Sequence, residues 1–187
     1  MNTAIHWAAP VLIIGAVMFG LIIVLISRQP VVGMSMGQAV APLAFGSAAL
    51  LLLSLPAVYA VQAEPAGAIG LVGHALLSIG LLLVVVVASP PILHPTINLP
   101  TGEHPLLFAL GVALTVGLLL TGIATFQAGV FPRAAAALLL AATAGFFFVF
   151  FVAEFLPPLA GQLGSALFGV LLAIGFAWIG TALWLRG

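Results

Sequence analysis

Six apolar stretches of about twenty residues each follow one another along this sequence, separated by short connections. Hydrophobic residues make up 65% of the chain and charged residues only 3%, and the mean hydropathy is +1.44. Soluble domains carry about 25% charged residues. A helix that crosses a bilayer needs about 20 mainly apolar residues, whereas an open sheet leaves backbone groups unpaired in lipid. The sequence therefore predicts an all-α, polytopic integral membrane bundle.

Prolines, glycines and charged residues mark the ends of the predicted helices. We expect six transmembrane helices in a single domain, 1–187, at about 7–27, 39–60, 67–88, 105–125, 134–153 and 163–184. The longest connection, 89–104, is rich in proline and apolar residues, which predicts an ordered cap loop over one end of the bundle. Because the linkers are short, any substrate or partner is expected in the membrane or at its surface.

A weak internal similarity links the third and sixth predicted helices. Four residues of the third helix have the same residue type at a constant offset in or just before the sixth. They are Gly70, Gly73, Ala75 and Leu76, which match Gly161, Gly164, Ala166 and Leu167 in that order. A 3+3 repeat of this kind would have inverted topology, which is typical of transporters with a site near the midplane. Chance is the alternative, since the chain is rich in Gly, Ala and Leu and the other helix pairs do not keep this offset.

Few side chains in this sequence are suited to catalysis or to metal binding. The formal charge comes from three arginines and three glutamates, and the chain has no lysine, aspartate or cysteine. These absences exclude disulfides, thiolate metal sites, cysteine nucleophiles, lysine Schiff bases and a P-loop lysine. A net charge of +0 leaves no basic surface for nucleic acid. Since no paired carboxylates and no nucleophile–base pattern occur, we expect no enzyme.

The three arginines also bear on orientation. With six spans both termini lie on one side, and cytoplasmic termini place Arg133 and Arg186 inside and Arg28 outside. Because cytoplasmic loops carry the excess of positive residues, this orientation is favoured. Trp7, Tyr59 and Trp184 then fall near the cytoplasmic interface.

His74 is a candidate ligand of a cofactor within the membrane. Gly70 precedes it by one helical turn, and such a small residue would let a flat tetrapyrrole lie against the helix. Ionisable groups at membrane depth are functional candidates by default. The simpler alternative is a neutral histidine that is hydrogen-bonded to a neighbouring helix.

A metal site is the second candidate. His94, Glu103 and His104 lie in the 89–104 connection, and Glu154 faces the same side in a six-span bundle. Two imidazoles and two carboxylates are suitable ligands for a divalent metal. The pattern has no metal-ligand spacing, however, and a carboxylate near a helix end can also extend to the interface without a ligand.

Small residues recur every four positions along the last helix and form a predicted helix-docking ridge: Ser165, Gly169, Ala173, Ala177 and Thr181. Such residues let helix backbones approach closely in lipid. The ridge predicts a seam either for a partner chain or for ordinary packing inside the bundle. The run of phenylalanines after Gly145 could stack on a carotenoid or quinone, or simply face lipid.

Two segments in the second half resemble a known group of proteins. They are TGIATFQAGVFPR at 121–133, with the AGVFPR segment as its most specific part, and GFAWIGTALWLR at 175–186. They resemble small, uncharacterised multi-pass membrane proteins of actinobacteria and Chloroflexi-like bacteria. The resemblance covers about 70 residues and implies a bacterial inner membrane protein, without implying any activity.

Together these features favour a non-catalytic accessory subunit of a larger membrane complex, respiratory or photosynthetic, whose partners are other transmembrane subunits and lipids. The alternative is a stand-alone carrier or binder of a small hydrophobic ligand, such as a lipid, quinone, carotenoid or tetrapyrrole. In that case His74 and the phenylalanines would line the pocket.

Overall fold

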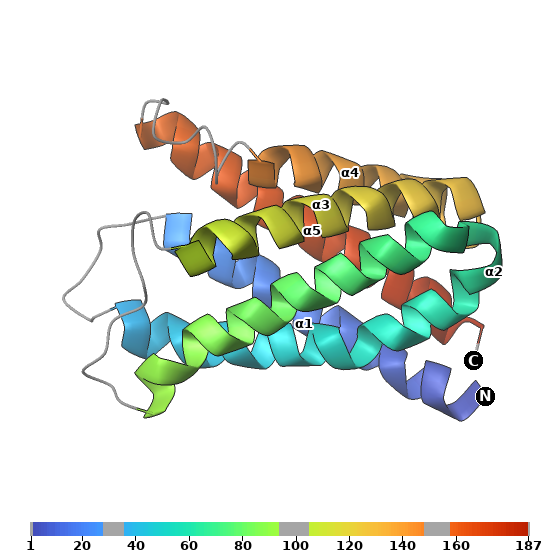
Figure 1. Ribbon diagram of the computed structural model, residues 1–187, viewed down its shortest axis with the longest axis horizontal. Coiled ribbons are helices and arrows are strands. Elements are labelled where there is room, and N and C mark those ends of the chain that lie inside the picture. The colour runs from blue at the N-terminus through green and yellow to red at the C-terminus, as the bar shows by residue number, and fades with distance from the viewer. Residues whose placement is uncertain (1, 28–35, 94–104, 148–157, 187) are drawn as a thin grey trace.

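A computed structural model describes residues 2–27, 36–93, 105–147 and 158–186. Within these ranges every regular element is a helix: α1 (Asn2–Ser27), α2 (Met36–Leu93), α3 (Pro105–Ala128), α4 (Arg133–Phe147) and α5 (Pro158–Trp184) (Figure 1). The prediction of an all-α protein is confirmed. α1, α2, α3 and α5 are long and apolar enough to cross a membrane, and α4 is a shorter apolar helix. The chain is therefore a membrane protein with transmembrane helices.

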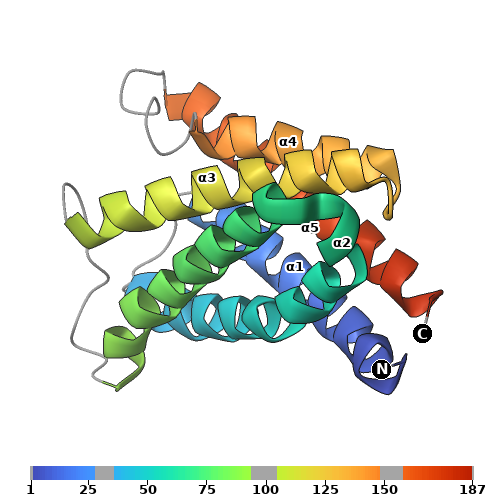
Figure 2. The ribbon, with the colours of Figure 1, turned by 45° about the vertical axis from the view of Figure 1, so that its right-hand side comes forward.

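α2 consists of two antiparallel arms that meet at Gly67 (Figure 2). Gly67 has φ 54° and ψ −148°, a backbone conformation that is essentially restricted to glycine. The predicted end of the second helix near residue 60 is therefore wrong: the first arm stays helical up to the reversal. Glu64 is exposed at this end of the bundle, so its charge does not need a non-helical linker.

The second arm of α2 is also longer than predicted, because residues 89–93 are helical rather than part of a cap loop. Pro90 lacks the N–H that would bond the carbonyl of Val86 in a regular helix. The Ser89 hydroxyl donates to this carbonyl at 3.0 Å and replaces the missing donor. The rest of the proposed cap, 94–104, lies outside the described residues.

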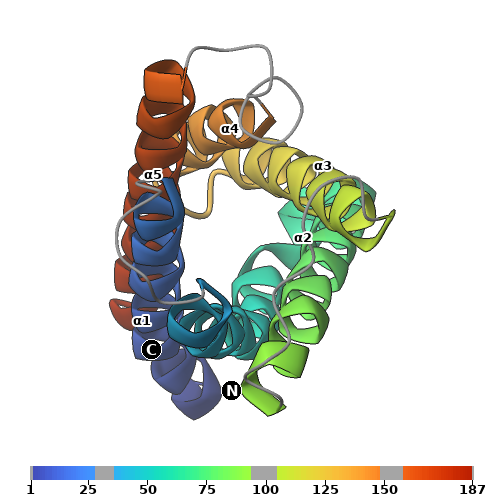
Figure 3. The same ribbon diagram turned by 90° about the vertical axis from the view of Figure 1, so that its left-hand side faces the viewer.

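The helices form a closed ring (Figure 3). α1 packs on α2 and α5, α3 packs on α2 and α4, and α4 packs on α5. Each of these seams contains a glycine whose added Cβ would lie within 3.1 Å of the neighbouring helix: Gly15 (α1–α2), Gly73 (α2–α3), Gly122 (α3–α4), Gly145 (α4–α5) and Gly20 (α1–α5). Close backbone approach through small residues is how helices associate in lipid.

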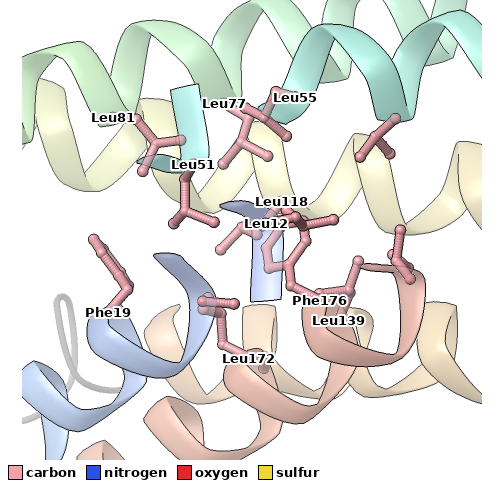
Figure 4. Close-up of a cluster of buried hydrophobic side chains, with 14 of the residues drawn as sticks. Leu12, Phe19, Leu51, Leu55, Leu77, Leu81, Leu118, Leu139, Leu172 and Phe176 are labelled. Carbon is pink, nitrogen blue, oxygen red and sulfur yellow. The ribbon is translucent and has the colours of Figure 1, made fainter. Parts of the chain in front are cut away.

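Leucine and phenylalanine side chains from all the helices meet inside the ring (Figure 4). Leu12, Leu118 and Leu139 are fully or almost fully buried there. The outer faces are also apolar: Leu53, with 74% of its surface exposed, and Phe108, with 65%, point away from the bundle. Apolar side chains on both sides of a helix are typical of a helix surrounded by lipid.

Both termini lie at the end of the bundle where α2 reverses (Figure 1). The ring of His6 in α1 stacks on that of Trp184 in α5, with their centroids 3.8 Å apart. The positions that suggested a repeat have different surroundings, since a Cβ on Gly73 would meet α3 at 2.7 Å whereas a Cβ on Gly164 would meet nothing within 4 Å.

Candidate functional site

His74 is the ionisable group buried most deeply between the described helices, with 5% of its surface exposed. It lies on the second arm of α2, two turns after the reversal. Its Nδ1 is 2.9 Å from the carbonyl oxygen of Gly70, one turn earlier. Its Nε2 is 3.4 Å from the amide nitrogen of Gln62 on the first arm. The ring of Tyr59 covers one side, with centroids 5.2 Å apart.

These contacts define the direction of the hydrogen bonds. A carbonyl oxygen only accepts, so Nδ1 of His74 donates to Gly70. In this tautomer Nε2 is free to accept from the Gln62 amide, which only donates through its nitrogen. Gln62 and His74 therefore tie the two arms of α2 together close to their turn. The structure thus shows the simpler alternative, a histidine that is hydrogen-bonded to a neighbouring helical segment.

Two buried threonines lie on α3, which packs on α2. Thr121 has 1% and Thr125 has 0% of its surface exposed. A Cβ placed on Gly73, which adjoins His74 in the chain, would lie 2.7 Å from the backbone nitrogen of Thr121. We call Gln62, His74, Thr121 and Thr125 the polar layer.

The structure does not support a tetrapyrrole at His74 and Gly70. Both ring nitrogens of His74 already face protein partners, so neither is left for an iron or magnesium ion. The space beside Gly70 is also filled: a Cβ there would lie 2.5 Å from Cβ of Ala66 and 3.6 Å from Cβ of Ala124. A flat macrocycle therefore has no room against this helix face.

The predicted docking ridge is occupied in its middle by the chain's own α1. A Cβ on Gly20 of α1 would lie 2.5 Å from the carbonyl oxygen of Gly169 and 2.8 Å from Cβ of Ala173. These two positions form an intrachain seam, which was the alternative to a partner-binding surface. Ser165 and Ala177 are partly buried, and Thr181 is exposed with its hydroxyl bonded to the carbonyl of Ala177 at 2.9 Å.

The residues of the predicted metal site, His94, Glu103, His104 and Glu154, all lie outside the described residues. Within the described ranges, no three His, Asp or Glu side chains lie close enough together to hold a metal ion. Of the phenylalanine run, Phe146 is buried and packs on Phe168 of α5 with ring centroids 4.9 Å apart. Phe147 is exposed.

The centre of the ring holds a small apolar cavity. Its volume is about 10 Å³ and its lining has no polar surface. Leucine and phenylalanine side chains line it: Phe19, Leu51, Leu55, Leu77, Leu81, Leu114, Leu118, Phe168, Leu172 and Phe176. This is about the space that one water molecule needs, whereas pockets for drug-sized ligands have about 300–1,000 Å³. Among the described helices, this cavity is thus too small for a quinone or pigment in this packing.

The sequence alone does not reveal the partners of His74. Gln62 lies beyond the expected end of the second helix, near residue 60. Continued helical spacing from Ser54 and Val58 to Gln62 was the signal that could have found it, since all three are fully buried on one face. The threonines offered no signal, because an isolated Thr is common in membrane helices.

Comparisons of the chain with protein-family models, with curated proteins and with solved structures found no match.

Proposed function

We propose that this protein is a non-catalytic accessory subunit of a larger assembly in a bacterial inner membrane, and that it binds its partners through its outer helical faces. The small size of the central cavity between the described helices is the observation that carries this proposal. A carrier or a conduit needs internal space, and the cavity inside the ring has a volume of about 10 Å³ with an entirely apolar lining. The outer faces of the helices are then the surfaces that remain for binding partner subunits.

The chemistry of the described polar residues supports the same proposal. His74 and Gln62 are used to join the two arms of α2. Arg186 donates to the carbonyl oxygen of Val130, and Arg133 lies over the ring of Phe126. These groups hold the fold together at one end of the bundle and do not converge on a substrate position.

We further propose that the chain crosses the membrane six times. The apolar part of α2 spans 51 residues, about twice the length of one membrane-spanning helix, and it reverses at Gly67. Each arm can thus cross once, and the apolar α4 adds a further span. Both termini then share a side, and the positive-inside rule for Arg133 and Arg186 places them in the cytoplasm.

A crosslinking scan over the outer faces tests the subunit proposal. A photoreactive amino acid is placed at an exposed position on each of several helices: Leu21 (α1), Leu53 and Val72 (α2), Phe108 (α3) or Val170 (α5). We expect crosslinks to a second protein from one contiguous group of these positions, in the source membrane. Leu118, which is 2% exposed, is the matched buried control. Crosslinks to lipid alone from every position would contradict the proposal.

The carrier of a small hydrophobic ligand is the competing function. It requires the Leu and Phe side chains at the centre to separate and open the cavity. A ligand retained stoichiometrically by a purified, partner-free chain would favour it over the subunit.

A further inference from the structure

Three atoms of the polar layer lack a hydrogen-bond partner in the protein although they are buried. They are Oε1 of Gln62 and the hydroxyl oxygens of Thr121 and Thr125. In the described part of the chain one other buried side-chain atom shares this property, Nδ1 of His6, whose ring is stacked on Trp184. Buried polar groups are normally satisfied by protein or by ordered water, since leaving them unpaired is costly.

The two threonines differ from other threonines in these helices. The hydroxyls of Thr115, Thr143 and Thr181 each donate to the carbonyl four residues earlier, at 2.7, 2.8 and 2.9 Å. This back-bonding is the usual way in which a helical threonine pairs its hydroxyl. The hydroxyls of Thr121 and Thr125 make no such bond, although carbonyls of α3 lie at the same spacing. A partner outside their own helix is therefore the way left to pair them.

The residues that carry the three unpaired atoms lie at a similar height in the bundle. Gln62 faces His74, and the glycine next to His74 contacts the backbone of Thr121. One turn closer to the reversal, a single Cβ added to Gly70 would lie 3.9 Å from the ring of Tyr59 on the first arm and 3.6 Å from Cβ of Ala124 on α3. The first arm of α2 and the threonine-bearing part of α3 thus approach the second arm at the same height.

We propose that the polar layer is a binding site for ordered water, which joins the Gln62 side chain of α2 to the threonine hydroxyls of α3. Oε1 of Gln62 only accepts, whereas each hydroxyl both donates and accepts. A water molecule offers two donors and two acceptors and so complements this set. A buried water typically makes about three hydrogen bonds to groups that are otherwise unsatisfied. A metal cation suits the site less well, because no carboxylate belongs to the layer.

Valine substitutions test the proposal, because valine has the shape of threonine without its hydroxyl. We expect Thr121→Val and Thr125→Val to lower the Tm in detergent, since each removes a partner of the bound water. Thr143→Val is the matched control, because Thr143 is also buried but is back-bonded to Leu139. If both layer variants keep or raise the Tm of the wild type while Thr143→Val lowers it, the hydroxyls are unpaired in a dry interior and the proposal is wrong.

A second measurement does not depend on stability. In the wild-type protein in bilayers, polarisation transfer from water to protein nuclei is compared between the methyl groups of Thr121, Thr125 and Thr143. We expect faster transfer to Thr121 and Thr125 than to Thr143. Equally slow transfer to all three would overturn the proposal.

Discussion

Gly20 and Gly169 bring α1 and α5 into reciprocal backbone contact. A Cβ added to Gly20 would lie 2.5 Å from the carbonyl oxygen of Gly169, and a Cβ added to Gly169 would lie 2.6 Å from the carbonyl oxygen of Gly20. Backbone atoms cannot move aside as a flexible side chain can. The seam that closes the ring therefore depends on the absence of a side chain at both positions.

Substitution of Gly169 by alanine should weaken this seam. The added methyl group forces α1 and α5 apart, and overpacking of this kind typically costs about 1–3 kcal/mol. The free energy of unfolding, measured by denaturant titration in detergent, should fall by an amount in this range. Gly164→Ala on the same helix is the control, because nothing lies within 4 Å of its added Cβ. It should leave stability unchanged or raise it by up to about 1 kcal/mol. Equal effects of the two variants would show that the seam is not close-packed.

Substitution of Gly67 by alanine should also destabilise the fold, for a different reason. No atom lies within 4 Å of an added Cβ, so space is not limiting, but the positive φ of 54° is strained for alanine. This strain costs about 1–3 kcal/mol. Thermal unfolding should therefore occur at a lower temperature than for Gly46→Ala, a helical position where an added Cβ makes only an ordinary contact at 3.8 Å. An unchanged Tm for Gly67→Ala would argue against the tight reversal.

The pair of Gln62 and His74 should be energetically coupled. Gln62→Leu or His74→Leu alone leaves a buried polar group without its partner, at a cost of about 1–3 kcal/mol. The double variant removes both groups, so its loss of stability should be smaller than the sum of the two single losses by about 0.6–2 kcal/mol. A cycle of Gln62→Leu with Leu139→Ala, a substitution at a buried position on α4, should be additive within about 0.5 kcal/mol. Additivity of the Gln62 and His74 variants would contradict the hydrogen bond.

The six-span topology can be tested with single cysteines, because the natural sequence contains none. Glu64 and Arg186 are exposed at the end of the bundle that holds both termini, and Leu93 is 73% exposed at the far end of the second arm of α2. In intact cells, a membrane-impermeant maleimide should label Leu93→Cys and not Glu64→Cys or Arg186→Cys. The opposite pattern would reverse the orientation. Labelling of Glu64→Cys and Leu93→Cys from one side would contradict the crossing of the second arm.

The all-helical class could be predicted because an apolar run of about twenty residues has few alternatives in lipid. The predicted helix ends were wrong where a charged residue or a proline does not end the helix. Glu64 and Pro65 suggested a linker, whereas one glycine with a positive φ makes the whole reversal. Pro90 suggested a loop, whereas the Ser89 hydroxyl lets the helix continue past it.

The candidate site could be predicted only in part, since His74 is visible as a polar residue in an apolar helix but its partners are not. Gln62 is distant by twelve positions and meets His74 only because α2 folds back at Gly67. For the same reason Gly169 could be recognised as a packing position, yet its partner Gly20 could not. Lipid-facing and helix-facing sides of apolar helices have similar compositions, so the sequence does not distinguish them.

The native mass of the protein, released from its source membrane into lipid nanodiscs without detergent, tests the subunit proposal most directly. We predict that the 19.0 kDa chain is found in a larger particle with at least one other polypeptide at fixed stoichiometry. Particles that contain only copies of this chain would contradict the proposal. A small hydrophobic molecule retained in such particles would instead support the carrier.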